Sequence, residues 1–87
     1  MPKVVLAAKA ERELYSLPRT VVDEFQRAFD ALERDATDPG QPYRVKPLRE
    51  PAGRRVIRFG NWGAIFRVEG DRIRILKVGP RSTLYRD

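Results

Sequence analysis

The hydrophobic periodicity of the chain changes from helical to extended near the middle of the sequence, and this change restricts the possible folds most strongly. In residues 19–35 the apolar side chains recur every three or four positions, as on one face of an amphipathic helix. From Arg54 onward they alternate with polar side chains, as in strands that bury one face. Residues 38–42, Asp-Pro-Gly-Gln-Pro, separate the two patterns because proline and glycine disfavour regular structure. The sequence therefore predicts helices first and a sheet second.

A strand is predicted before the helices. Val4–Ala7 is a short, mostly β-branched and aliphatic run, and Ala8–Leu17 follows it with apolar residues at helical spacing. Pro18 interrupts that helix and suits an early position of the next one, Arg19–Asp35. The apolar stripe of this second helix consists of Val21, Val22, Phe25, Ala28, Phe29 and Leu32. We expect that stripe to face the core.

The second half predicts three sequential strands joined by glycine-containing turns. They are Arg54–Phe59, Ala64–Val68 and Arg72–Val78, followed by a short tail, Arg81–Arg86, that can add a final extended segment. We expect one α+β domain over residues 1–87, in which an N-terminal strand and a helical hairpin precede an antiparallel three-strand meander. The helices would cover one sheet face and leave the other open and studded with arginine.

Charge is distributed unevenly along the chain, which has 87 residues and a net charge of +6. Residues 1–43 carry six Lys/Arg against eight Asp/Glu, a net charge of −2, whereas residues 44–87 carry twelve against four, a net charge of +8. Such a concentration of cations attracts polyanions. The pattern favours a polyanion or an acidic protein as partner over a merely solvated face.

Several classes of protein are excluded by composition. The chain has no cysteine, so a disulfide framework and a thiolate zinc site are impossible, and we expect neither a metal nor a cofactor. Its apolar runs are too short to span a bilayer, and its first residues lack the apolar region of a signal peptide. These features predict a cytoplasmic protein without membrane contact.

Five segments, taken in order over nearly the whole chain, resemble the RelE/ParE toxin superfamily of toxin–antitoxin modules, and RelE more closely. They are Leu14–Pro18, Lys46–Leu48, Arg55–Arg67, Lys77–Arg81 and Tyr85-Arg86. For RelE-like members the resemblance implies ribosome-dependent cleavage of mRNA and neutralisation by a cognate antitoxin, with a heterotetramer of the two as a candidate assembly. ParE-like members share the fold and act on DNA gyrase. The fold alone does not choose between these activities.

The resemblance also implies the roles of individual residues. An RNA strand supplies its own nucleophile, the 2′-hydroxyl, so the protein needs a proton acceptor and cations around the phosphate. Arg81 matches a family arginine that would contact the scissile phosphate, and Tyr85 is the candidate general base. Arg58 and Arg54 match cationic positions that would stabilise the phosphate or the leaving group. The remaining candidates for RNA or phosphate binding are Lys46, Arg49, Arg55, Arg67, Lys77 and Trp62. Each has a simpler alternative as a solvated cation or a packing aromatic.

Two features of the sequence weaken the nuclease interpretation. Gly63 stands where RelE-like nucleases usually have arginine, and the chain contains no histidine. Loss of a fixed cation beside the reacting phosphate would remove about 2–4 kcal/mol of transition-state stabilisation. The sequence therefore leaves three functions open: an mRNA endoribonuclease, a ParE-like gyrase inhibitor, and a catalytically weakened homologue that mainly binds its antitoxin.

Overall fold

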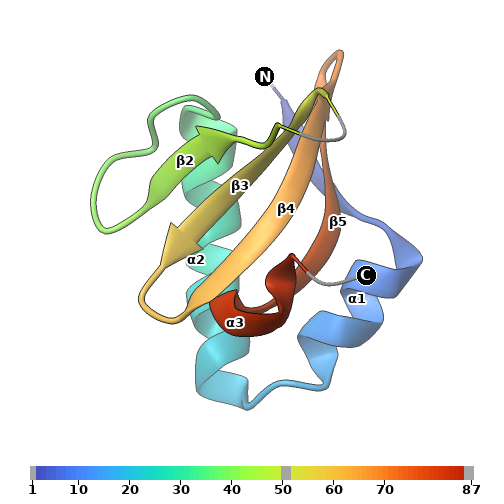
Figure 1. The fold of residues 1–87 in the computed structure, drawn as a ribbon, viewed down its shortest axis with the longest axis vertical. Helices are drawn as coiled ribbons and strands as arrows, with labels where there is room; N and C mark the ends of the chain where they lie inside the picture. Colours follow the sequence, from blue (N-terminus) through green and yellow to red (C-terminus); the bar gives the residue numbers. More distant parts are fainter. Residues whose placement is uncertain (1, 50–51, 86–87) are drawn as a thin grey trace.

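Five strands form one sheet in the order β1-β5-β4-β3-β2 (Figure 1). The computed structural model describes residues 2–49 and 52–85. The strands are β1 (Lys3–Leu6), β2 (Arg44–Pro47), β3 (Arg54–Phe59), β4 (Trp62–Glu69) and β5 (Arg72–Pro80). β1 pairs with β5 in parallel, and the other neighbouring strands are antiparallel. The predicted N-terminal strand and three-strand meander are thus confirmed.

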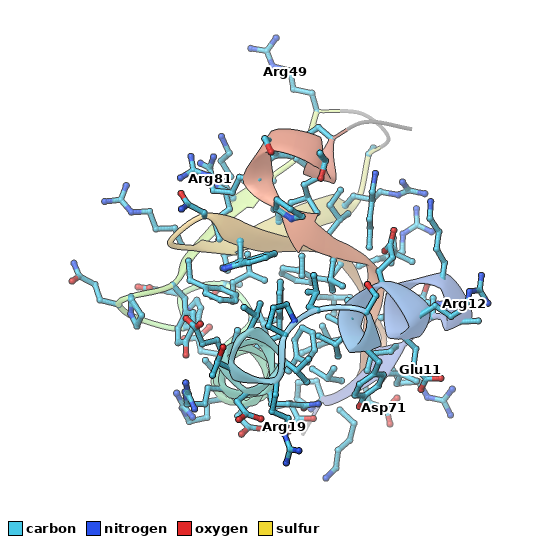
Figure 2. All side chains as sticks on the ribbon, turned by 90° about the horizontal axis from the view of Figure 1, so that it is seen from below. Glu11, Arg12, Arg19, Arg49, Asp71 and Arg81 are labelled. Atoms are coloured by element: carbon cyan, nitrogen blue, oxygen red, sulfur yellow. The ribbon has the colours of Figure 1, made fainter. Side chains whose placement is uncertain are left out.

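Two helices, α1 (Ala8–Tyr15) and α2 (Arg19–Arg34), cover one face of the sheet. We call this the helix face, and the opposite face the outer face; Figure 2 shows the sheet between these two helices and the short α3 (Arg81–Leu84). The α+β fold and the helical hairpin are as predicted. No helix within the described ranges is both long and apolar enough to cross a membrane.

The main core lies between α2 and the helix face of the sheet. The predicted stripe of α2 is buried, with Phe25 at its centre and fully inaccessible. The Phe25 ring meets Phe59 edge-on at a centroid distance of 4.9 Å and Trp62 at 6.2 Å. Such tilted aromatic pairs add to the stabilisation from burying the rings. This packing fixes the turn between β3 and β4 against α2.

β2 is a strand that the sequence did not predict. Its residues Arg44 and Lys46 are exposed, and Val45 is its half-buried apolar residue. An edge strand of four residues that ends in proline is too short for the alternation of apolar and polar side chains to be recognised in the sequence. Its register comes from β3, where Arg44 pairs with Arg58.

The predicted extended tail, Arg81–Arg86, is wrong over residues 81–84, which form α3, one turn of helix packed on the outer face. Arg86 lies outside the described residues. Leu84 is 1% exposed and lies with Val56 and Ile65 in a second apolar cluster, against which Leu48 and Leu76 also pack. Burying Leu84 on the sheet removes its side chain from water, which an extended tail would not do. The sequence predicted an open outer face. In the structure α3 covers this face near its middle.

A β-bulge in β5 decides which side chains reach the outer face. Ile65 pairs with Lys77 and Phe66 with Ile75, so Leu76 is an additional residue on β5. The Glu13 carboxylate of α1 accepts a hydrogen bond from the Val78 backbone N–H at 3.1 Å. The bulge shifts the alternation by one residue, so that Lys77 lies on the outer face and Val78 in the core.

Candidate anion-binding site on the outer face

The strand register builds one row of residues across the outer face. Arg44 pairs with Arg58, Arg58 with Gly63, and Gly63 with Gly79. Residues directly opposite each other in neighbouring strands point to the same face. Two arginines therefore stand next to two glycines, and the absence of glycine side chains leaves space above β4 and β5.

α3 occupies this space. A Cβ atom at Gly63 would lie 2.7 Å from Cδ2 of Leu84, closer than unbonded carbon atoms approach each other. The start of α3 is held by the turn between β3 and β4. There the Arg81 backbone N–H donates to the Asn61 carbonyl at 2.8 Å, and Nη1 of Arg81 donates to the Gly60 carbonyl at 3.4 Å. These contacts set the position of Arg81 and of Tyr85, which follows α3.

Two recesses meet at Arg58 and Arg81. The first, of about 220 Å³, is lined by Pro42, Arg44, Arg58, Phe59, Gly60 and Arg81. The second, of about 400 Å³, is lined by Arg58, Asn61, Pro80, Arg81, Ser82 and Tyr85. The structure thus brings Arg58, Arg81 and Tyr85 together from β3, α3 and the residue after α3. We call these three residues the recess residues.

The charge around these recesses is entirely positive among the described residues that line them. Three of their lining residues are arginine and none is Asp or Glu. Guanidinium groups bind phosphate oxygens through two parallel hydrogen bonds, and several cations around one space favour an anion with more than one charged oxygen. The phenol of Tyr85, which is 49% exposed, is accessible to a bound molecule. The arrangement is suited to binding a phosphate group.

Arg54, the fourth residue that the sequence analysis assigned to catalysis, lies away from the recess residues. It shares the outer face with Arg58 but is four residues distant along β3, which corresponds to roughly 13 Å at the rise of an extended strand. It is absent from the lining of both recesses. Arg67 lies beside it, because the two residues pair across β3 and β4.

The other predicted binding residues are dispersed. Lys46 lies on the outer face, in a wider recess of about 650 Å³ that also includes Arg44 and Arg58. Lys77 pairs with Ile65 on the same face. Arg49 is exposed beyond the end of β2, where Figure 2 shows its side chain extending away from the fold.

Arg55 and Trp62 belong to the helix face. Arg55 pairs with Phe66, a residue of the main core, and Trp62 packs against Phe25. Neither side chain can join the recess residues without leaving its own face of the sheet. Their predicted role in RNA binding receives no support from their placement.

Arg44 is the residue at the site that the sequence analysis missed. It lines the first recess and stands next to Arg58 in the register. Recognition of β2 as a strand would have revealed it, because period-two alternation then places Arg44 and Lys46 on one face. Asn61 was also missed, and no periodicity indicates that its carbonyl holds α3.

Solved structures of toxins from toxin–antitoxin systems share this fold. A chain of the RelBE2 toxin–antitoxin complex from Mycobacterium tuberculosis is 27% identical, with a TM-score of 0.75, over 93% of this chain and 100% of that one. A chain of the archaeal RelE–RelB complex from Pyrococcus horikoshii is 26% identical, with a TM-score of 0.76, over 92% and 94%. YafQ from E. coli has a TM-score of 0.79 over 98% and 99%, and its 12% identity shows the fold alone.

The fold and the cationic recess therefore describe a toxin of a type II toxin–antitoxin system. The family model for the "ParE toxin of type II toxin-antitoxin system, parDE" matches residues 4–85, and the chain belongs to this family. The resemblance to the RelE/ParE superfamily that the sequence suggested is confirmed. A comparison with curated protein sequences found no match.

Proposed function

We propose that this toxin cleaves mRNA on the ribosome in the cytoplasm, with the scissile phosphate bound between Arg58 and Arg81. The observation that supports the proposal is the convergence of the recess residues on one space that no described acidic residue lines. A site that only solvated its cations would not need to bring two guanidinium groups and a phenol together from separate elements. The similarity to chains of the RelBE2 and RelE–RelB complexes, at 26–27% identity, also supports the proposal.

The proposed chemistry is transesterification within the RNA strand. The 2′-hydroxyl oxygen attacks the adjacent phosphorus, its proton passes to the hydroxyl oxygen of Tyr85 while that hydroxyl gives its own proton to water, and the bond from phosphorus to the 5′-oxygen breaks. The products are a 2′,3′-cyclic phosphate and a 5′-hydroxyl, whose oxygen takes a proton from water. Arg81 and Arg58 stabilise the negative charge that increases on the phosphorane oxygens and on the leaving oxygen.

We also propose a cognate antitoxin as the partner that keeps this toxin inactive in the cell. The M. tuberculosis relative was solved as a toxin–antitoxin complex, and the P. horikoshii relative as a RelE–RelB complex. The net charge of +8 on residues 44–87 suits a partner segment rich in Asp and Glu. Co-expression with the product of the neighbouring open reading frame should yield a complex of defined stoichiometry, which tests the heterotetramer.

Induced expression followed by mapping of mRNA 5′ ends tests the nuclease proposal. Wild-type protein should produce new 5′ ends within translated codons, and Arg81→Ala and Tyr85→Phe should each reduce them by about 100-fold or more, as expected when a transition-state interaction is removed. Arg12→Ala is the matched control, because Arg12 is an exposed arginine on α1, on the side of the molecule away from α3 (Figure 2). Growth arrest with intact mRNA would exclude this function.

Inhibition of DNA gyrase is the second candidate function, and two observations favour it. The matching family is described as ParE toxin, and the position of the usual RelE arginine is Gly63, with Leu84 packed over it. The recess thus lacks one cation of the RelE pattern. Inhibition of supercoiling by purified toxin, without RNA cleavage, would support this function, whereas protein that neither cuts RNA nor inhibits gyrase would indicate a homologue that mainly binds its antitoxin.

A further inference from the structure

A second group of arginines lies on the outer face, at the end of the sheet opposite the recess residues. Arg54 pairs with Arg67, and Arg67 pairs with Arg74, so three arginines leave three neighbouring strands on the same face. Strands lie about 4.8 Å apart, which places the outer two within roughly 10 Å of each other at the backbone. We call Arg54, Arg67 and Arg74 the arginine row.

The side chain of Arg67 extends toward the start of β3. A Cβ atom at Gly53 would lie 3.8 Å from Nε and 3.9 Å from Nη2 of Arg67. The Arg67 guanidinium therefore lies over Gly53, next to the backbone of Arg54. Like charges opposite each other in a sheet repel, which destabilises the row unless a compensating anion lies beside it.

In the described part of the chain, the compensating anion beside the arginine row is Glu69, and its ion pair with Arg74 is weak. Nη1 of Arg74 lies 3.8 Å from Oε1 of Glu69, and both side chains are about half exposed, so this ion pair contributes little. Nε of Arg54 is buried and has no hydrogen-bond partner among residues 2–49 and 52–85. A buried donor without an acceptor is uncommon in folded proteins and calls for an explanation. A bound anion beside the Arg54 guanidinium would offset its unpaired charge and reduce the repulsion along the row.

The arginine row is separate from the recess residues. Arg54 and Arg58 are roughly 13 Å apart along β3. The cluster of Val56, Ile65 and Leu84 lies between the two groups and carries α3. One phosphate cannot reach both groups, whereas a polyanion with several phosphates can. Lys46, which pairs with Val56 on the outer face, offers a cationic route along the β2 side of α3.

We propose that the arginine row is a second phosphate-binding site, which holds a phosphodiester group of a single nucleic acid strand whose other phosphates reach the recess residues. Phosphate fits better than a carboxylate because its additional oxygens can accept from three guanidinium groups at once. The proposal rests on the proposed function only in taking RNA as that strand. The site itself is proposed to bind any phosphate group, so its binding can be tested without measuring RNA cleavage.

The first experiment observes the guanidinium Nε–H signals by NMR during titration with inorganic phosphate at constant ionic strength, kept with chloride. The Arg54 and Arg67 signals should shift and reach saturation, and should do so equally in Arg81→Gln protein. The Arg54 shift should disappear in Arg67→Gln, a variant of an exposed residue that should fold normally. An Arg54 signal that stays in place, or that responds to chloride alone, would overturn the proposal.

The second experiment measures binding of single-stranded RNA of two lengths, a dinucleotide and a strand long enough to reach both groups. Arg54→Gln and Arg67→Gln should each weaken binding of the long strand about tenfold, as for one charge-assisted hydrogen bond, and have a much smaller effect on the dinucleotide, which reaches only one of the two groups at a time. The slope of log affinity against log salt should fall by about 0.7 for each phosphate that the variant no longer binds. Arg55→Gln is the matched control, because it removes the same charge from the neighbouring residue on the opposite face.

The outcomes separate this proposal from the proposed function. Absence of mRNA cleavage in cells, together with saturable phosphate shifts and length-dependent RNA binding, would reject the nuclease and retain the second site. Equal decreases in affinity for Arg55→Gln and Arg54→Gln would reject the site, because only total charge would then matter. Weaker binding to a polyglutamate peptide, with RNA binding unchanged, would also reject it and assign the arginine row to an acidic protein partner.

Discussion

Replacing Gly63 by alanine tests whether α3 is held on the sheet by the contact between Leu84 and the bare backbone of β4. The new Cβ would lie 2.7 Å from Cδ2 of Leu84 and 3.2 Å from the carbonyl oxygen of Ile57. Leu84 is 1% exposed, so it cannot turn away from the new methyl group without giving up its own burial. Overpacking of this kind costs about 1–3 kcal/mol of unfolding free energy. For a domain of this size the melting temperature falls by about 4–8 °C for each kcal/mol.

A double-mutant cycle isolates that contact. Leu84→Ala should cost about 2–5 kcal/mol by itself, because it deletes a buried leucine side chain. It also frees the space that the alanine at position 63 needs, so Gly63→Ala should cost at least about 1 kcal/mol less in the Leu84→Ala background. Urea unfolding of the four proteins measures both values.

Gly79 provides the matched control, since it pairs with Gly63 in the same row. The nearest atom to a Cβ at Gly79 is Oγ1 of Thr83 at 3.9 Å, an ordinary van der Waals distance. Gly79→Ala should therefore cost little or no stability, because the added methyl group meets no atom closer than an ordinary contact. The reasoning is refuted if Gly63→Ala is as harmless as Gly79→Ala, or costs the same with and without Leu84.

Two further substitutions test carboxylates that hold the backbone. Glu13→Ala should lower stability by about 1–3 kcal/mol, because the N–H of Val78 at the β5 bulge loses its acceptor, whereas Glu11→Ala, on the same helix and exposed, should have little effect; thermal unfolding compares them. The Thr37 hydroxyl, with the larger effect, and the Thr37 N–H donate hydrogen bonds to the Asp35 carboxylate and lower its pKa below the usual 3.8. These hydrogen bonds therefore stabilise the protein above that pH, and their contribution is lost as acid protonates Asp35 in the folded protein. Asp35→Asn should reduce the change in stability with pH in this acidic range, and an unchanged pH profile would contradict the assignment.

The parts of the fold that were predictable from sequence are those with enough repeats of a pattern. The stripe of α2 from Val21 to Leu32 covers three turns of helix, and β3 to β5 alternate over six to nine residues each. Such lengths let the helical and extended periods be distinguished. The order of these elements then fixed the two-layer arrangement.

Two short elements, β2 and α3, were not predicted from the sequence. Their conformation and position depend on contacts with neighbouring strands more than on their own residues. β2 has four residues and takes its register from β3. α3 also has four, and its position depends on the contact of Leu84 with Gly63, two residues 21 positions apart in the chain. Period and propensity carry no information about such a contact. The bulge in β5 was hidden for the same reason, since Lys77 faces outward only because Leu76 is an additional residue.

The candidate site was also predictable only in part. Family resemblance selected Arg58, Arg81 and Tyr85, and the structure brings them to one recess. It also selected Arg54, which shares their face but not their location, because alternation assigns a face and gives no distance between residues on it. Gly63 was interpreted as a missing cation, and its position under Leu84 shows what the glycine permits instead.

The pairing of the first strand with the last one has a consequence for the timing of folding. Among the described residues, the strand that pairs with β1 is β5, with Lys3 opposite Arg72 and Leu6 opposite Ile75. Contacts so distant in sequence form late, since a long loop must close before they contribute. Arg81 and Tyr85 lie still further along the chain, so a nascent toxin cannot assemble its recess until residue 85 has left the ribosome that made it. An antitoxin that is already present then meets the toxin at the moment when it first becomes harmful.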